Sequence, residues 1–336
     1  MANTKLLITG GAGFIGSNFI KHILNKYPDY QVINLDKLTY CGNLENLIDV
    51  ENNPKYKFIK GDICDAKIID QVFSENPDFV INFAAESHVD RSILDPTAFL
   101  KTNIQGTHTL LEASQKYKIK RFIQISTDEV YGSTENESFK ETDPLNPSSP
   151  YSSAKAAGDL LALSYFKTYN LPVLITRSTN NFGPFQYPEK IIPLFITNLL
   201  ENKKVQVYGD GLNVRDWLYV ENNCDAIDFI LHNGQNGEIY NIGSANEKTN
   251  LDITKIILRE LNKDETHIEH IKDRPGHDRR YSLNCGKLKK LGWKNENNNF
   301  EELLKDTICW YKENEQWWKK IKTGEYLEYC KKQYNI

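Results

Sequence analysis

Short apolar runs alternate with longer segments of helical periodicity through the first half of the chain. The run at residues 5–9 is followed, at residues 17–27, by apolar side chains that recur every three or four positions. Further apolar runs cover residues 31–36, 56–62, 79–85, 121–127 and 172–177, and further helical patterns cover residues 66–75, 97–117 and 150–169. Strands that alternate with helices predict an α/β fold with a Rossmann-type, doubly wound parallel sheet.

The pattern changes after Arg177. Loops rich in Asn, Gly and Pro appear, for example at residues 179–188. The short strands and helices predicted beyond this loop cover residues 205–208, 238–242, 251–261 and 301–311. We expect an NAD-binding Rossmann domain over residues 1–178. Residues 179–336 are expected to form mainly a smaller α/β lobe that binds a sugar nucleotide, and some segments of this half can return to the sheet.

Composition narrows the class of protein. A chain of 336 residues, 40% hydrophobic and 26% charged, is typical of a soluble globular protein with one large domain and a smaller companion. The net charge of -4 gives no reason to expect a nucleic acid partner. No apolar stretch approaches the ~20 residues that span a bilayer, and no signal-peptide pattern opens the sequence. We therefore expect a cytoplasmic enzyme that binds neither nucleic acid nor a membrane.

The cysteines and histidines show no metal-binding spacing. The six cysteines are scattered without a C-x-x-C pair, and the seven histidines form no H-E-x-x-H or similar cluster. Reduced, structural thiols fit this pattern best. We expect no metal.

The first strand runs into a glycine-rich loop. Its spacing is G-x-x-G-x-x-G through Gly10, Gly13 and Gly16, or G-x-G-x-x-G if Gly11 is taken first. Either pattern alone is weak. Between a strand and a helix, however, such a loop lets the backbone approach a pyrophosphate at the helix amino end. The loop therefore predicts a dinucleotide site.

Acidic and small residues follow the next strands at the edge where parallel sheets bind ligands. Asp36 ends the second strand, where a carboxylate accepts hydrogen bonds from the ribose hydroxyls of NAD and repels the 2′-phosphate of NADP. Lys37 can partly offset that repulsion, but NAD remains the expected cofactor. Asp62, Ala84 and Ala85 follow the third and fourth strands, although Asp62 could instead cap a helix.

The strand at residues 121–127 leads into a group of acid and base residues. Tyr151 and Lys155 are four positions apart, so on a helix they project from one face, and the ammonium can lower the pKa of the phenol. Hydride transfer from an alcohol needs no more than this pair. Asp128 and Glu129 are then an additional acid/base pair, as an elimination would require. The alternative for these two carboxylates is a helix-start pair.

Longer motifs support the redox interpretation. They are TGGAGFIG at residues 9–16, TYCGN at 39–43, ESHVDRS at 86–92, TDEVYG at 127–132, SPYSSAKAA at 149–157, NNFGPFQYPEK at 180–190, RDWLYV at 215–220 and DRPGHDRR at 273–280. Together they resemble the extended short-chain dehydrogenase/reductase family, and within it the dTDP-glucose 4,6-dehydratases. The departures are mild: Cys41, for example, stands where that family usually has alanine.

The resemblance implies a reaction and a role for each catalytic residue. Members of the family oxidise the glucose C4 hydroxyl, eliminate water across C5 and C6, and return the hydride to C6, which regenerates NAD. Tyr151 would take the C4 hydroxyl proton, Lys155 would hold Tyr151 partly ionised, and Thr127 would hydrogen-bond the C4 oxygen. Glu129 would remove the C5 proton. Asp128 would protonate the leaving hydroxyl, which requires a raised pKa.

The resemblance also implies binding residues and a homodimer packed through two helices per subunit. The cofactor-binding set is Gly10, Gly13, Phe14, Ile15, Gly16, Asp36, Lys37, Thr39, Asp62, Ile63, Ala84, Ala85, Tyr151, Lys155 and Asn181. The substrate-binding set is Ser87, Thr127, Asn180, Glu189, Lys190, Arg215, Asn250, Asp273 and His277. Arg215 is the strongest candidate for the diphosphate, since guanidinium pairs well with phosphate oxygens. For His277 a structural, hydrogen-bonded role is the alternative.

Three other functions are considered. A UDP-glucose 4,6-dehydratase would differ only in the contacts to the nucleotide base. A nucleotide-sugar 4-epimerase would need Tyr151, Lys155 and NAD, but not the acid/base pair Asp128 and Glu129. A non-catalytic, dinucleotide-binding subunit would be expected to lack Tyr151 or Lys155, and both are present.

Overall fold

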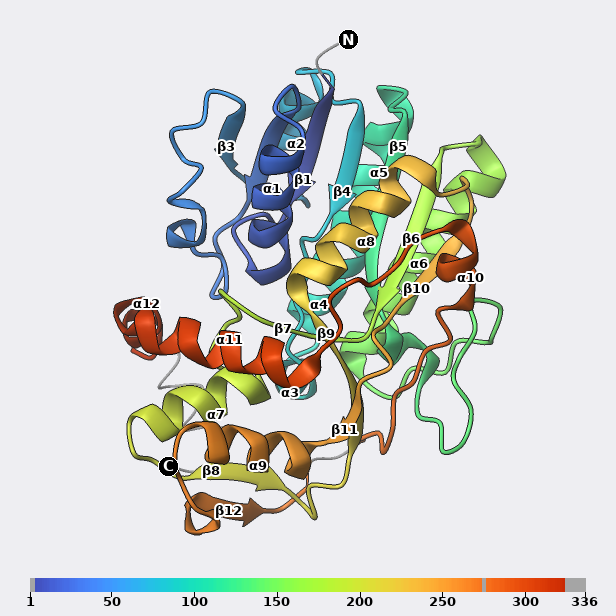
Figure 1. Ribbon diagram of the computed structural model, residues 1–336. Coiled ribbons are helices and arrows are strands. Elements are labelled where there is room, and N and C mark those ends of the chain that lie inside the picture. Colours follow the sequence, from blue (N-terminus) through green and yellow to red (C-terminus); the bar gives the residue numbers. More distant parts are fainter. Residues whose placement is uncertain (1–3, 274–275, 324–336) are drawn as a thin grey trace.

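A parallel sheet of seven strands forms the upper part of the molecule in Figure 1, which shows the computed structural model. The structure describes residues 4–273 and 276–323. The strand order is β10-β6-β5-β4-β1-β2-β3, and every neighbouring pair is parallel. The strands are β1 (Lys5–Thr9), β2 (Gln31–Asp36), β3 (Tyr56–Lys60), β4 (Phe79–Asn82), β5 (Arg121–Thr127), β6 (Val173–Ser178) and β10 (Ile239–Ile242). The predicted Rossmann-type, doubly wound sheet is confirmed.

Helices cover both faces of this sheet. Successive side chains of a strand point to opposite faces, so Leu6 and Ile8 of β1 enter one core cluster and Leu7 enters the other. The first cluster lies under α1 (Phe14–Lys26) and α8 (Val220–Asn233). The second lies under α2 (Ala66–Phe73), α5 (Thr107–Lys116) and α6 (Pro150–Tyr169). Burial on both faces explains why the central strands are rich in apolar residues, whereas the edge strand β3 is only partly buried.

Some predicted boundaries differ from those observed. The helix expected at residues 17–27 already begins at Phe14, because it starts directly from the glycine loop. The helix expected at 97–117 is three successive segments: α4 (Thr97–Phe99), a π-helical segment η2 (Leu100–Gly106) and α5. The strands expected at 56–62 and 79–85 end at Lys60 and Asn82, so the residues that follow them are loops at the sheet edge.

The second half of the chain builds a smaller set of strands and helices below the sheet in Figure 1. One small sheet has the order β11-β9-β7 and another pairs β12 with β8. These strands are β7 (Asn180–Phe182), β8 (Val205–Tyr208), β9 (Val214–Tyr219), β11 (Glu247–Thr249) and β12 (Ile268–Ile271). The helices are α7 (Ile191–Leu200), α9 (Asn250–Glu260), α11 (Phe300–Glu313) and α12 (Glu315–Ile321). They share a third core cluster, which includes Trp217 and Trp318.

Two elements of the second half belong to the large sheet. Strand β10 pairs with β6, and α8 packs against α1. The remaining short helices are η1 (Leu44–Leu47), α3 (Val89–Leu94), η3 (Asp128–Tyr131), η4 (Glu265–His267) and α10 (Gly286–Leu291). The cysteines among the described residues are free, and Cys330 lies outside them. Within the described ranges no helix has the length and apolar character to cross a membrane.

Candidate active site

The carboxyl ends of the large sheet's strands open into one elongated cavity. Every residue predicted to bind the cofactor lines it, and so does every predicted catalytic residue. The predicted substrate residues Ser87, Asn180, Glu189 and Lys190 line it as well. Lining residues that were not predicted from the sequence include Tyr40, Glu86, Thr102, Ser178, Gln186 and Tyr187. Several of these lie next to recognised motifs, but their types alone indicate no chemistry.

The glycine loop permits a close approach between three segments. Gly10 has a φ of +70°, and a Cβ there would meet the backbone nitrogen of Ala84 at 2.6 Å. A Cβ on Gly16 would meet the carbonyl oxygen of Gly10 at 2.4 Å. Helix α1 begins at Phe14, and its N-cap, Gly13, makes no side-chain cap hydrogen bond. Both residues line the cavity, so the amino end of the helix borders it. Such an end attracts an anion, and these features fit the pyrophosphate of a dinucleotide.

The charges near Asp36 favour NAD. The Asp36 carboxylate accepts hydrogen bonds from the backbone N–H groups of Ala12 at 2.9 Å and Leu38 at 2.8 Å, which fix it at the end of β2. Lys37 Nζ lies 2.8 Å from Asp62 Oδ2, so Asp62 neutralises the cation that could have offset the repulsion of a 2′-phosphate. The alternative role for Asp62 does not apply to α2, because Asp65 caps that helix.

Strand β5 delivers Thr127 and the two carboxylates to the cavity. The chain turns into the 3₁₀ segment η3 directly after Thr127. Thr127 Oγ1 donates to Asp128 Oδ1 at 3.1 Å and accepts from the backbone N–H of Glu129 at 3.3 Å. The turn that the two adjacent carboxylates require is therefore present, and both side chains line the same cavity.

Asp128 lies in an environment that favours its neutral form. Its side chain is buried, and Oδ2 has no hydrogen-bond partner among the described residues. Burial, and then the negative charge of Glu129, raise the pKa of Asp128 to about 8. The carboxyl of Asp128 thus holds a proton at neutral pH, as the acid role expected from the resemblance requires.

Helix α6 presents Tyr151 and Lys155. Ser149 and Ser152 form a reciprocal capping box at its start, and Pro150 occupies the first turn. The backbone N–H of Tyr151 donates to Ser92 Oγ at 3.2 Å, which holds this turn against α3.

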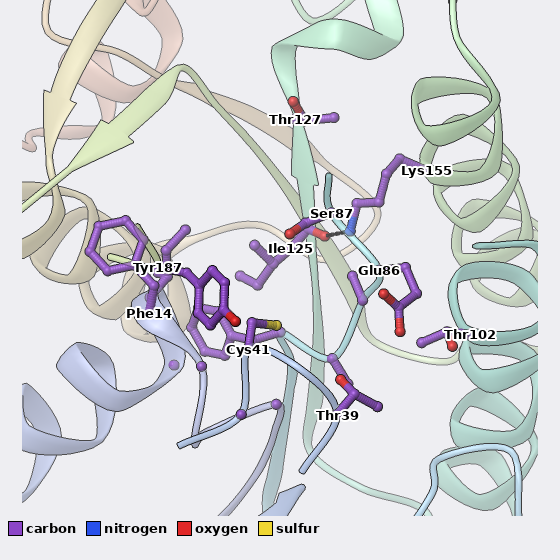
Figure 2. A pocket seen from close by; sticks show the side chains of 18 of the residues that line it. Phe14, Thr39, Cys41, Glu86, Ser87, Thr102, Ile125, Thr127, Lys155 and Tyr187 are labelled. Atoms are coloured by element: carbon purple, nitrogen blue, oxygen red, sulfur yellow. Dashed lines mark hydrogen bonds between the residues drawn. The ribbon is translucent and has the colours of Figure 1, made fainter. Parts of the chain in front are cut away.

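The ionisation of this pair differs from the expectation. Burial lowers the pKa of Lys155 to about 8, and its Nζ donates to the carbonyl oxygen of Ile125. Figure 2 shows this contact, with Ser87 and Glu86 on the neighbouring segment and Phe14, Cys41 and Tyr187 at the other side of the cavity. Burial also raises the pKa of Tyr151, and the charge of Glu129 adds to this. The protein alone therefore does not lower the pKa of the phenol.

A second cavity adjoins the first. The two share Glu129, Asn180, Glu189 and Lys190, and the second is also lined by Arg215, Asn250 and His277. Asp273 lines neither cavity, but its Oδ1 lies 2.6 Å from His277 Nδ1 and orients that ring. Residues of this cavity that were not predicted from the sequence include Asp90, Tyr208 and Tyr281. They come from distant segments, and no local spacing connects them.

Outside these cavities, one group of described side chains has the spacing of a metal site: His22, Asp225 and Asp228. Asp228 already binds several donors, including His22 Nε2 at 3.0 Å and Lys26 Nζ at 2.7 Å. The group is explained as a charge cluster that joins α1 to α8, so nothing in it calls for a metal.

Comparison with known proteins places this geometry in a family. Residues 7–307 match the family model described as GDP-mannose 4,6 dehydratase. The low-salt glycan biosynthesis protein Agl12 of Haloferax volcanii is 50% identical, and the match covers 91% of this chain and 98% of that protein. A dTDP-glucose 4,6-dehydratase of Streptomyces niveus is 46% identical over 96% of each chain.

A solved structure agrees with these relatives. The crystal structure of a dTDP-glucose 4,6-dehydratase from Bacillus anthracis, in complex with NAD, is 49% identical. It superposes with a TM-score of 0.89 and covers 95% of this chain and 99% of that one. The motifs, the sheet and these similarities agree, and the chain belongs to the dTDP-glucose 4,6-dehydratase family.

Proposed function

We propose that this protein dehydrates dTDP-glucose to dTDP-4-keto-6-deoxyglucose with bound NAD. The observation that carries the proposal is the placement of a neutral carboxyl, Asp128, and a second carboxylate, Glu129, in one cavity with Tyr151 and Lys155. A 4-epimerase needs only the last two. The sequence identity to a dTDP-glucose 4,6-dehydratase, and to another that was solved in complex with NAD, supports the same reaction.

The first step is oxidation at C4 of the sugar. When bound, NAD would accept the hydride from C4 and supply it to C6 after water has left, and Glu129 would then return the proton to C5. Tyr151 accepts the proton of the C4 hydroxyl, and Thr127 hydrogen-bonds the same oxygen. Burial raises the pKa of Tyr151, and in this structure Lys155 Nζ donates to the carbonyl oxygen of Ile125. We therefore assign the stabilisation of the phenolate to the Lys155 ammonium, one helical turn away, when NAD and substrate occupy the cavity.

The second step is loss of water. The C4 ketone acidifies the C5 hydrogen, and Glu129 removes it as a proton. The bond between C6 and its oxygen then breaks, and Asp128 delivers a proton to that oxygen, which leaves as water. This assignment requires one charged and one neutral carboxyl, and the raised pKa of Asp128 supports it.

The second cavity receives the nucleotide part of the substrate. Arg215, with Asn250 and His277, binds the diphosphate and nucleotide there, and Asp273 holds His277 in place. The sugar occupies the junction of the two cavities, where Ser87, Asn180, Glu189 and Lys190 lie. Lys190 Nζ donates to the carbonyl oxygen of Ser87 at 3.0 Å, and this hydrogen bond connects two of the residues that line the junction.

The test is turnover by the NAD-loaded protein on dTDP-glucose, UDP-glucose and CDP-glucose. The alkaline absorbance of the 4-keto-6-deoxy product reports dehydration, and proton NMR identifies any C4 epimer. We expect the highest kcat/KM with dTDP-glucose. Higher kcat/KM with UDP-glucose would make the protein a UDP-glucose 4,6-dehydratase. Formation of the galactose epimer alone would reject dehydration.

Three further features belong to the proposal: a cytoplasmic location, a division of the chain near residue 178 with β10 and α8 returning to the large sheet, and a homodimer that packs through two helices of each subunit. Exposed leucines support the homodimer, since Leu160 on α6 is 59% exposed and Leu100 on η2 is 51% exposed. Light scattering after gel filtration tests it, and a monomeric mass at micromolar concentration would reject it.

A further inference from the structure

Tyr281 lies at the second cavity beside Arg215. It is 3% exposed and lines that cavity together with Arg215 and Glu129. Its position is fixed by the backbone: Val214 N–H donates to the carbonyl oxygen of Arg279 at 2.8 Å, and Tyr281 N–H donates to that of Val214 at 3.3 Å. The segment that carries Tyr281 is thus bound to the start of β9, one residue before Arg215.

The Arg215 guanidinium is held from two directions. Its central carbon lies 4.1 Å from the centroid of the Tyr281 ring, which is a cation–π contact. Its Nη1 donates to the carbonyl oxygen of Val214 at 2.7 Å, and its Nη2 donates to that of Asp278 at 2.9 Å. The ring supports the face of the guanidinium, while the carbonyl groups bind its edge.

The Tyr281 ring is itself anchored. Its hydroxyl donates to Asp278 Oδ2 at 2.6 Å, and Ser148 Oγ donates to the same oxygen. Burial raises the pKa of Tyr281, so the hydroxyl keeps its proton and remains a donor. Ser148 directly precedes Ser149, the cap of α6. Asp278 therefore connects the support of Arg215 to the loop from which the catalytic helix begins.

We propose that Tyr281 is a positioning residue, whose anchored ring holds the Arg215 guanidinium ready to pair with the diphosphate of the substrate. The inference rests on the proposed function, which assigns the diphosphate to Arg215. An arginine that is already fixed loses less side-chain entropy when the ligand binds. Tyr281 should therefore affect nucleotide binding more than the chemical steps.

The test measures the affinity of the NAD-loaded protein for dTDP by calorimetry. Tyr281→Leu should weaken dTDP binding about tenfold, the order expected for a desolvated cation–π contact. The KM for dTDP-glucose should rise in parallel, while kcat changes less than about twofold because the lost contact acts on binding. Tyr281→Phe keeps the ring and loses only its anchor, so it should weaken dTDP binding less, about threefold.

A matched control is Tyr240→Leu. Tyr240 on β10 is buried, with Lys287 Nζ 4.6 Å from its ring centroid, but it lines neither cavity. This variant should lose stability without any change in dTDP affinity. In the Arg215→Ala background, Tyr281→Leu should cause no further loss of dTDP affinity, because Tyr281 acts on binding only through the Arg215 guanidinium.

The outcomes separate the inference from the proposed function. If Arg215→Ala binds dTDP as tightly as wild type, the assigned role of Arg215 fails and the inference fails with it. If Arg215→Ala is weakened but Tyr281→Leu is not, only the inference is overturned. Should Tyr281→Leu not fold, Tyr281→Phe and Asp278→Ala decide: each should weaken binding about threefold through loss of the anchor, and wild-type affinity in both would overturn the inference.

Discussion

Asp128 and Glu129 are neighbours in the sequence but meet different surroundings. Asp128 is buried at the end of β5 and hydrogen-bonded by Thr127, whereas Glu129 is partly exposed. Because Asp128 is the more buried of the two, burial raises its pKa, and the negative charge of the neighbouring Glu129 raises it further. This asymmetry supports the opposite roles that we propose for two chemically equal groups, Asp128 as the acid and Glu129 as the base.

Removing either role should stop the reaction after its first step. Asp128→Asn cannot donate the proton, and Glu129→Gln cannot remove the one at C5, so dehydration should fall about 10²- to 10⁴-fold in each. Oxidation at C4 uses Tyr151 and should be less affected. Stopped-flow absorbance of reduced nicotinamide should then show a signal that forms and persists on the enzyme. Wild-type rates of product formation in both variants would contradict the assignment.

The raised pKa of Asp128 should also be visible in stability. In the unfolded chain its pKa returns to near 4, so between about pH 4 and pH 8 the folded protein holds the extra proton. Its contribution to stability therefore falls as pH rises through this window, by at most about 1.4 kcal/mol per pH unit. Asp128→Asn removes this dependence.

Urea unfolding of wild type and Asp128→Asn at several pH values measures the effect. The variant should gain stability relative to wild type as pH rises from 5 to 8, while groups common to both cancel. The lowered pKa of Lys155 changes stability only above about pH 8, outside the window. A difference between the two proteins that does not vary with pH would mean that Asp128 is ionised in the folded state.

The pair Tyr151 and Lys155 and the pair Asp128 and Glu129 could be predicted from the sequence, because the two members of each pair lie close together along the chain. Tyr151 and Lys155 share a helix face, and Asp128 follows the end of a strand. Tyr281 offers no such signal, since it reaches Arg215 only through the pairing of its segment with β9. The pKa of Tyr151 was also beyond the sequence, because it depends on burial and on the distance to Glu129.

At the scale of elements, α6 is positioned by its first turn. The capping box of Ser149 and Ser152 satisfies backbone N–H groups at the helix start, and Tyr151 lies in that same turn. Ser149→Ala should cost about 1 kcal/mol of stability. It should also lower kcat, because the turn that carries the phenol loosens.

The control is a cap far from the site. Asn299 caps α11 by accepting from the N–H of Glu302, so Asn299→Ala should cost a similar free energy of unfolding. Its kcat should match wild type when both are assayed well below their Tm. Equal kcat in the two variants would show that the first turn of α6 tolerates the loss of its cap.

Element boundaries show what periodicity can predict. The apolar pattern at residues 97–117 indicated helix correctly, but it could not reveal the π-helical segment η2, which packs against α6. Thr102, in this segment, lines the cofactor cavity. A wider turn redirects the side chains that follow it, so the residues that face a cavity cannot be read from a regular helical repeat.

At the scale of the whole molecule, the large sheet depends on chain from beyond residue 178. Strand β10 extends it at β6, and α8 covers β1 and packs on α1. Ile227 and Ile230 of α8 are fully buried in the same cluster as Ile20 and Ile23 of α1. A short apolar segment such as β10 has the same sequence pattern whichever sheet it joins. The sequence therefore allowed segments of the second half to return to the large sheet, but it did not show which ones do.

The fragment of residues 1–178 should therefore fail to fold cooperatively. Without α8, the fragment would expose the apolar face of α1 and one face of the sheet to solvent. The fragment has no other segment that could bury this apolar surface. We expect broad thermal unfolding and strong binding of a hydrophobic dye, as for a loosely packed state. Joining residues 220–243 to residue 178 through a flexible linker restores α8 and β10 and should sharpen the transition. A cooperative transition in the shorter fragment would mean that α1 and the sheet form a sufficient core alone, and that the contacts of α8 serve to orient the second half of the chain.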